Sequence, residues 1–196
     1  MAYTIDISFF FGTLNIAQKS TTSVQSDVDA SISILEPEFL TSLLGFKLYD
    51  AYKAGIEAGS PAANWTALRD GKAYTNRAGV DAKWQGLKYT AGSQKKSLIA
   101  NYVYWHWLKN EATMTTGTGE KVANNQNASN ASPIHKQVAA WNEMVRWAWD
   151  LIEFLLSNPT DYPDFADHYA RSLFYTVSAD GTRTKNRILY TQNRFF

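Results

Sequence analysis

The stretch from Ser132 to Ser157 constrains the fold of this chain most strongly, because it has the pattern of a long amphipathic helix. Ser132 is a suitable N-cap, Pro133 would take the first helical position, and Asn158-Pro159 predicts the end of the helix. Its apolar residues recur at spacings of three and four in two adjacent rows: Ile134, Val138, Trp141, Val145, Ala148, Ile152 and Leu155, beside Ala140, Met144, Trp147, Leu151 and Phe154.

The apolar arc of this helix covers about 220°, with Trp149 on one rim and Phe154 on the other. An ordinary surface helix needs an apolar stripe only somewhat wider than about 100°. Two explanations remain open. The helix is central and packed on both flanks by its own chain, or a neighbouring subunit covers one rim. The two explanations can hold at different positions of the same helix.

Length and composition limit the remaining possibilities. The 196 residues predict one domain, or one domain with extended arms. The 19 basic residues nearly balance the 18 acidic ones, so the whole molecule has no electrostatic drive toward nucleic acid or an anionic membrane. The absence of cysteine excludes disulfides and thiolate chemistry. The first residues make a poor signal peptide, and no apolar run approaches the roughly 20 residues that span a bilayer, so no membrane partner is expected.

Residues 1–35 are expected to form an N-terminal strand and an extended arm. Apolar and polar side chains alternate at the start of residues 3–16, which is a strand pattern. Consecutive aromatic residues then occupy both faces, so this strand must be covered by its own chain or by another. The Ser- and Thr-rich stretch 18–33 reads as an extended connection, which either reaches a neighbour or lies at the edge of the home sheet. The aromatic residues concerned are Phe9, Phe10 and Phe11.

Residues 36–160 are expected to form the core, a small bundle of three to four helices with an inserted β-hairpin. The fold class is therefore mainly α. The expected elements, in order, are a helix over 37–58 opened by Pro37, a short helix over 61–69, a β-hairpin at about 71–90, a helix over 93–112, a long polar loop over 113–131 and the helix over 132–157.

Residues 161–196 are expected to form a C-terminal extension. A short helix over 165–171 precedes a hairpin from about residue 173, whose turn is indicated by Asp180-Gly181. Basic residues occupy alternate positions of the return strand and so share one face of it. That face is either solvated or contacts an acidic protein surface or phosphate. The basic residues of the stretch 172–196 are Arg183, Lys185, Arg187 and Arg194.

The sequence contains no recognisable catalytic or metal-binding motif. His106, His135 and His168 lie far apart, and no metalloprotease spacing joins them. His106 lies on an apolar helix face and is expected to be a core residue. Asp150 and Glu153 are more simply the solvated stripe of their helix than a catalytic pair. The chain is therefore predicted not to be an enzyme, and no cofactor or metal is expected.

Five ordered pieces over about residues 3–157 carry a resemblance to a known family. They are Ile5-Asp6-Ile7-Ser8-Phe9-Phe10; Glu38-Phe39-Leu40 with Leu43-Leu44-Gly45 and Leu48-Tyr49; the hairpin around Gly71–Trp84; Ile99-Ala100-Asn101-Tyr102-Val103-Tyr104-Trp105 with Thr115-Thr116-Gly117; and Val138 with Trp141-Asn142-Glu143-Met144. With them the chain resembles head–tail connector proteins of tailed bacteriophages, especially the ring or neck adaptors of crAss-like phages. The hairpin from Leu173 onward has no counterpart.

The resemblance implies a structural virion protein that is assembled in the host bacterial cytoplasm. Such a protein forms a dodecameric homo-oligomeric ring below the portal protein, extends the DNA channel and joins the tail or further neck proteins. In such a ring we expect subunit contacts from Phe9, Phe10, Phe11, Trp149, Phe154, Phe195 and Phe196. We expect contacts to the portal or to channel DNA from Arg183, Lys185, Arg187 and Arg194.

Two other classes of function compete with the connector. A carbohydrate- or ligand-binding module of a virion or surface protein would use exposed Trp and Tyr as stacking platforms. Most aromatic residues here stand at helical spacing in long helices, which suits a core or an interface better than a sugar groove. An enzyme such as a lytic hydrolase is the third class, and it would need a constellation that one sequence does not reveal.

Overall fold

The computed structural model describes residues 3–111, 114–116, 119–121, 134–165, 175–177 and 183–185. Within these residues the chain is mainly helical, which confirms the predicted fold class at that level. The described α-helices are α1 (Thr22–Leu44), α2 (Phe46–Glu57), α3 (Ala63–Asp70), α4 (Leu98–Glu111) and α5 (Ile134–Ser157). The described antiparallel hairpins are β1–β2 (Lys72–Thr75, Asp81–Trp84), β3–β4 (Lys88–Ala91, Gln94–Ser97), β5–β6 (Met114–Thr116, Gly119–Lys121) and β7–β8 (Tyr175–Val177, Arg183–Lys185).

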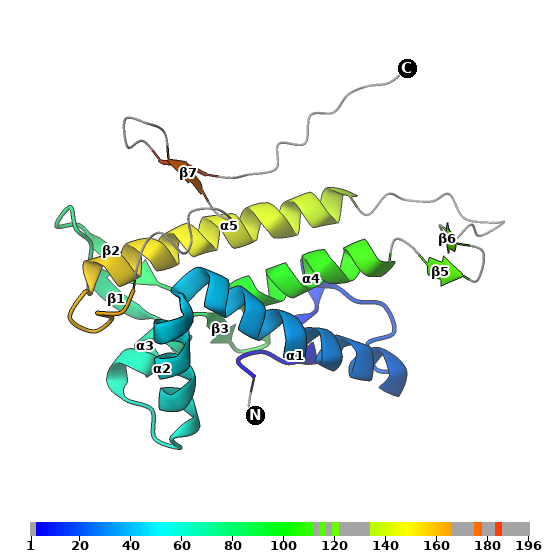
Figure 1. The fold of residues 1–196 in the computed structure, drawn as a ribbon, viewed down its shortest axis with the longest axis horizontal. Helices are drawn as coiled ribbons and strands as arrows, with labels where there is room; N and C mark the ends of the chain where they lie inside the picture. Colours follow the sequence, from blue (N-terminus) through cyan, green and yellow to red (C-terminus); the bar gives the residue numbers. More distant parts are fainter. Residues whose placement is uncertain are drawn as a thin grey trace.

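The three long helices α1, α4 and α5 form the body of the fold, with α4 between the other two (Figure 1). The residues of α4 from Leu98 to Tyr104 are all at most 7% exposed, because neighbouring elements cover the helix on all sides. The middle place in the bundle therefore belongs to α4, although the sequence suggested the later helix for it.

Helix α5 forms as predicted and ends at Ser157, while its expected cap Ser132 and Pro133 lie outside the described residues. Its broad apolar arc packs on α4, on the β1–β2 hairpin and on the N-terminal segment. The buried members of the arc are Ala140, Met144, Val145, Trp147, Ala148, Leu151, Ile152, Phe154 and Leu155. Packing by the chain itself thus accounts for most of the arc, and Trp149 on the rim remains half-buried.

The expected N-terminal strand is not formed. Residues 3–16 instead contain two short 3-10 turns, η1 (Ile7–Phe9) and η2 (Gly12–Leu14). Asp6 caps the first turn, since its carboxylate accepts a hydrogen bond of 2.7 Å from the Ser8 N–H. The turns allow the consecutive Phe9 and Phe10 both to be buried, whereas a strand would send them to opposite faces.

Helix α1 begins at Thr22, so the extended connection predicted over 18–33 is wrong, and so is the helix start at Pro37. Val28 and Ile32 are buried and continue the apolar face of the later turns toward the N-terminus. The hydroxyls of Ser26 and Ser31, which lie outside this face, each donate to the carbonyl four residues earlier. The helix also runs through the boundary expected between residues 35 and 36.

The predicted helix over 37–58 is divided at Gly45, which separates α1 from α2. Gly45 has φ of 83° and ψ of 154°, a backbone conformation that L-residues avoid. Its N–H still donates to the Thr41 carbonyl, while its own carbonyl accepts from the Tyr49 N–H. A single glycine therefore closes one helix and starts the next in a new direction.

The inserted hairpin is confirmed as β1–β2, but the chain then forms a second hairpin, β3–β4, where the next helix was expected to begin. Helix α4 starts only at Leu98, because Ser97 caps it: the Ser97 hydroxyl oxygen accepts from the N–H of Ile99 at 3.0 Å. The same hydroxyl donates to the Leu87 carbonyl at 2.7 Å and so ties the helix start to the hairpin.

Other predicted elements fall on partly described regions. The short helix after Pro61 is confirmed as α3, and the polar loop over 113–131 contains the hairpin β5–β6. Strands β7 and β8 pair within the stretch where the C-terminal hairpin was expected, while the short helix expected over 165–171 lies outside the described residues beyond Phe165. Among the helices that the structure describes, none has the length and apolar character needed to cross a bilayer.

Candidate interaction surface

A groove of about 740 Å³ opens on the described part of the molecule. It lies between the N-terminal turns, strand β4, the start of α4 and the first half of α5. We call it the basic groove. Its apolar floor consists of Phe9, Phe11, Leu14, Ala139, Ala140 and Trp147, and its charged rim consists of Lys95, Lys96, Lys136 and Glu143.

The floor of the basic groove contains a buried hydrogen-bond donor. Trp147 is only 2% exposed, and its indole Nε1–H has no acceptor among the described residues. A buried donor without an acceptor costs about 1–3 kcal/mol.

The rim of the basic groove has an excess of positive charge, since three lysines face one glutamate. The Lys95 ammonium donates to the Ser8 hydroxyl at 2.5 Å and lies 5.5 Å from the centre of the Phe9 ring. Lys96 and Lys136 are exposed. The carboxylate of Glu143 accepts from the Arg146 guanidinium at 2.5 Å, which lowers the pKa of Glu143. The groove therefore favours an apolar group flanked by anions.

The aromatic residues proposed for subunit contacts do not all lie on a surface. Phe9 and Phe10 are 4% and 0% exposed and pack into the core of their own chain. Phe154 is 1% exposed and stacks on Trp84, with ring centres 5.9 Å apart. These three side chains are already covered by their own chain, because the N-terminal turns and the β1–β2 hairpin fold back over the bundle.

The remaining proposed contact residues divide into two groups. Phe11 and Trp149 are half-buried, and Phe11 lines the basic groove, so both keep apolar surface that a neighbour could cover. Phe195 and Phe196 lie outside the described residues. The groove is therefore the surface on which the interface hypothesis now rests. Sequence reasoning missed it, because its walls come from three separate parts of the chain.

The basic C-terminal residues are only partly placed. Arg183 and Lys185 lie on strand β8, opposite Val177 and Tyr175 of β7. The strand register gives them alternate positions along β8. Arg187 and Arg194 lie outside the described residues. The portal or DNA contact proposed for this basic group stays a prediction.

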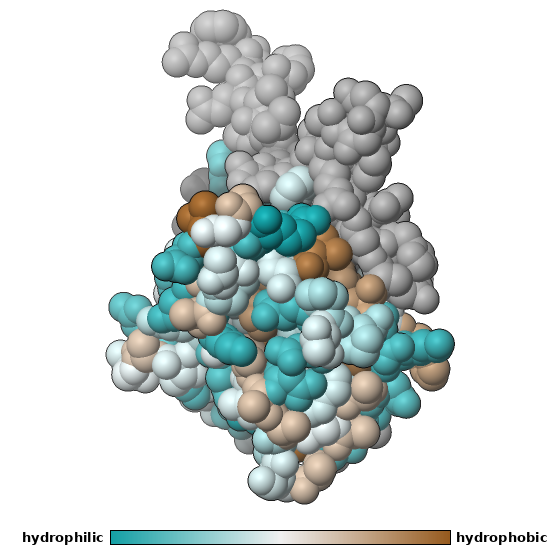
Figure 2. Space-filling model, turned by 90° about the vertical axis from the view of Figure 1, so that its left-hand side faces the viewer, coloured by the Kyte–Doolittle hydropathy of each residue, from teal (hydrophilic) through white to brown (hydrophobic). Residues whose placement is uncertain are grey.

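The end of the molecule that carries α2, α3 and the β1–β2 hairpin is mixed in character. Figure 2 views this end and shows a few hydrophobic residues separated by hydrophilic ones. Exposed apolar side chains here include Phe46 at 68% and Val80 at 58%. Scattered apolar residues of this kind are normal on a protein surface, so the described part of this face does not indicate a docking site.

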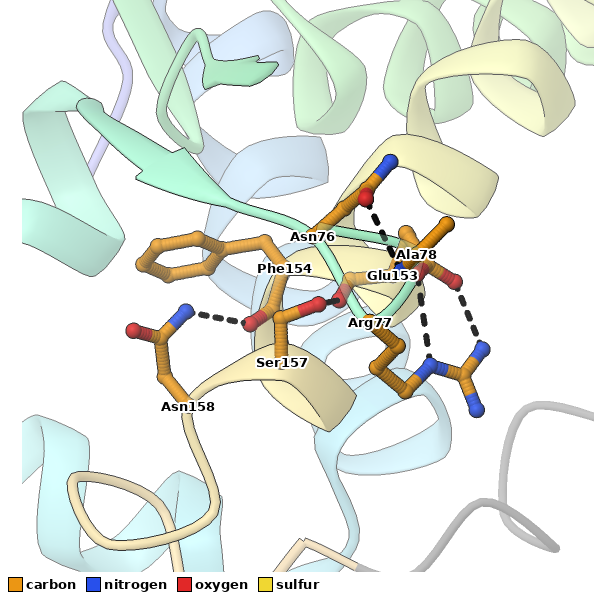
Figure 3. Close-up of polar contacts among 7 residues, drawn as sticks. All are labelled: Asn76, Arg77, Ala78, Glu153, Phe154, Ser157 and Asn158. Atoms are coloured by element: carbon orange, nitrogen blue, oxygen red, sulfur yellow. Dashed lines mark hydrogen bonds and ion pairs between the residues drawn. The ribbon is translucent and has the colours of Figure 1, made fainter. Parts of the chain in front are cut away.

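Glu153 on α5 forms an ion pair with Arg77 that holds the β1–β2 turn against the helix (Figure 3). The Arg77 guanidinium donates to both Glu153 carboxylate oxygens, at 2.7 and 3.2 Å. Asn76 shapes the turn, because its side-chain oxygen accepts from the N–H groups of Ala78 and Val80. Asp150 lies 3.5 Å from the Arg146 guanidinium. Asp150 and Glu153 thus act in surface contacts, as the sequence suggested.

A second, smaller cavity of about 170 Å³ lies where α1, α2 and the N-terminal segment meet. Glu36 is 4% exposed there, and one of its carboxylate oxygens accepts from the Thr4 N–H at 2.7 Å. Its other oxygen has no partner among the described residues. Burial raises the pKa of Glu36 above its ordinary value of 4.5, and burial also raises the pKa of Tyr52 to about 12. Glu36 therefore binds the N-terminal segment to α1, but the burial of its carboxylate makes the ionised form unfavourable in the folded protein.

Replacing Glu36 by glutamine should make the stability of the protein less dependent on pH. The folded-state pKa of Glu36 exceeds the unfolded one, so its ionisation opposes folding. The contribution of Glu36 to the free energy of unfolding is largest below about pH 4.5, where the carboxyl is protonated. It falls as the pH rises through the folded pKa, by about 1.4 kcal/mol for each unit by which the folded pKa exceeds the unfolded one. Glu36→Gln keeps the oxygen that accepts from Thr4 and cannot ionise.

Urea unfolding of both proteins between pH 4 and pH 8 tests this prediction, with the exposed Glu38→Gln on the same helix as control. The free energy of unfolding of Glu36→Gln minus that of the native chain should increase with pH. The prediction is wrong if the difference is constant, or if the control shows the same trend.

The described residues contain no cluster of three or more side chains suited to hold a metal ion. His106 is half-buried and packs edge-on against Tyr102 and Trp105, and burial lowers its pKa. This environment agrees with a structural rather than a ligating histidine. Comparison of the chain with protein-family models, with curated proteins and with solved structures found no match.

Proposed function

We propose that this chain is a head-to-tail connector of a tailed bacteriophage, a ring adaptor that docks below the portal, extends the DNA channel and joins the tail. It is a structural virion protein that acts through contacts with copies of itself and with neighbouring neck proteins. The observation that carries the proposal is the basic groove, a large recess with an apolar floor and an excess of positive charge on its rim. Such a recess suits a protein partner.

The pieces of sequence that carry the resemblance also support the proposal by where they lie. Three of them fall on α1, α4 and α5, which pack together as the body of the fold. Ile5–Phe10 forms the turn that closes one side of the basic groove, and Trp141–Met144 belongs to the helix on the other side. These pieces of sequence therefore lie together in one packed part of the fold.

A carbohydrate- or ligand-binding module is the second candidate, and the placement of the tryptophans argues against it. Trp84 and Trp147 are buried, and the other five are half-buried. Trp105 packs on Trp141, with ring centres 5.1 Å apart, instead of presenting an open face. A sugar-binding platform needs an aromatic face open to solvent. A glycan array on which the purified chain binds specifically would favour this second candidate over the connector.

Electron microscopy of phage particles tests the connector function. A phage that carries a tagged copy of the chain should show the tag between head and tail, in a ring of repeated copies. Loss of the gene should give DNA-filled heads without tails, and a copy of the native gene supplied in trans should restore tailed particles. Absence of the chain from purified particles would overturn the proposal. The conservative Val80→Ala, at the exposed hairpin turn, serves as a control that should leave particle assembly unchanged.

A further inference from the structure

The outer face of α1 carries a second unassigned surface. Asp27, Ala30, Ile34 and Glu38 stand three to four residues apart, so they share one side of the helix, and all four are exposed. Ile34 is 67% exposed, with one carboxylate about two turns before it and another about one turn after it. This acidic stripe is an apolar anchor flanked by negative charge.

The acidic stripe and the basic groove are complementary in two respects. The groove offers an apolar floor, where an isoleucine can be buried. The groove rim has exposed Lys96 and Lys136, where the stripe has Asp27 and Glu38. An amphipathic helix that lays its apolar anchor in a groove is a common mode of protein recognition.

We propose that the basic groove of one copy binds the acidic stripe of α1 of a second copy. No residue of α1 lines the groove, so the two surfaces are distinct and every copy presents both. The contact is therefore heterologous, and each added copy leaves one stripe and one groove open until a ring closes. This inference rests on the proposed ring function and names the surfaces that would build the ring.

Cysteine cross-linking on the full chain tests the contact, because the native sequence contains no cysteine. Ile34→Cys places one thiol on the stripe, and Ala139→Cys places another on the exposed part of the groove floor. Under mild oxidation a chain with both substitutions should give a reducible ladder of dimers, trimers and larger species on denaturing gels. A mixture of the two single variants should give dimers only. The matched control pairs Ile34→Cys with Val80→Cys, which lies at the β1–β2 turn away from the groove.

Charge reversal provides an independent second measurement. In the cross-linking background, Glu38→Lys alone and Lys136→Glu alone should each reduce the yield of the ladder at least tenfold, because each brings like charges together. The two substitutions combined should restore most of the yield. All four positions are exposed, so circular dichroism is expected to show native folding in every variant.

Three results would overturn the proposed contact: no ladder from the double-cysteine chain, an equal ladder from the control pair, or dimers from Ile34→Cys alone, which would indicate a contact between two stripes. These experiments use the purified chain, whereas the connector function is tested by its place in phage particles. If the chain is found in the neck but gives no ladder, the connector function stands and the proposed contact between stripe and groove is refuted. If the chain gives a ladder but is absent from particles, the contact stands and the connector function is refuted.

Discussion

Replacing Trp84 by alanine is expected to lower the free energy of unfolding by about 3–5 kcal/mol. Trp84 is 0% exposed and ends strand β2, where its ring stacks on Phe154 of α5. Its indole N–H donates to the Leu68 carbonyl at 2.9 Å. The substitution would leave a cavity between the hairpin and the helix, and it would also leave that carbonyl without its donor.

Urea unfolding followed by circular dichroism measures this loss. Trp84→Phe should cost less, because it keeps an aromatic ring beside Phe154 but loses the N–H. The control Val80→Ala, in the same hairpin but 58% exposed, should change the stability by no more than about 0.5 kcal/mol. A cost for Trp84→Ala below 1 kcal/mol would show that the hairpin does not pack on α5 as described.

Replacing Gly71 by alanine is expected to cost about 3 kcal/mol or more, from backbone strain and a steric clash together. Gly71 ends α3 with φ of 97°, a conformation that side chains rarely permit. An added Cβ would lie 2.5 Å from the Trp84 carbonyl oxygen and 2.7 Å from the Gln85 carbonyl carbon. Both are main-chain atoms, so no side chain can rotate away to make room.

Gly79→Ala is the matched control for this prediction. Gly79 also has positive φ, at 76°, but an added Cβ would meet no atom within 4 Å. Its substitution should therefore cost only the backbone strain, about 1–2 kcal/mol. The same unfolding measurement on both variants separates strain from clash. Equal losses in the free energy of unfolding for the two variants would mean that the close approach of Gly71 to the main chain of Trp84 and Gln85 adds no steric cost.

Local sequence signals were enough where one short pattern decides the conformation. The three- and four-residue spacing of apolar side chains predicted α5. The turn Asn76-Arg77-Ala78-Gly79 between two β-prone pieces predicted the β1–β2 hairpin, and Asn76 does hold this turn with its own side chain. The same signals misplaced the start of α4, because the Ser97 cap depends on a hydrogen bond to Leu87, which is ten residues away.

The N-terminal third shows why other predictions were wrong. The alternation over residues 3–16 is a strand signal only if a neighbouring strand pairs with it. Here the segment forms two turns, of which the first packs against β4 and α1 and the second against α4 and α5. The Ser- and Thr-rich start of α1 looks extended by composition. It becomes helical because Val28 and Ile32 find partners in the core, and tertiary packing outweighs weak intrinsic propensity.

By itself, the sequence determined that this is a mainly helical domain with a long, broadly apolar helix near its C-terminal end, since periodicity is a local property that needs no partner. Only the tertiary structure decided which aromatic residues are buried. The sequence predicted Phe10 and Phe154 at subunit contacts, but the N-terminal turns and the β1–β2 hairpin cover them within their own chain. It alone also brought Phe11, Lys96 and Trp147 around one groove, because their side chains are assembled from segments far apart along the chain.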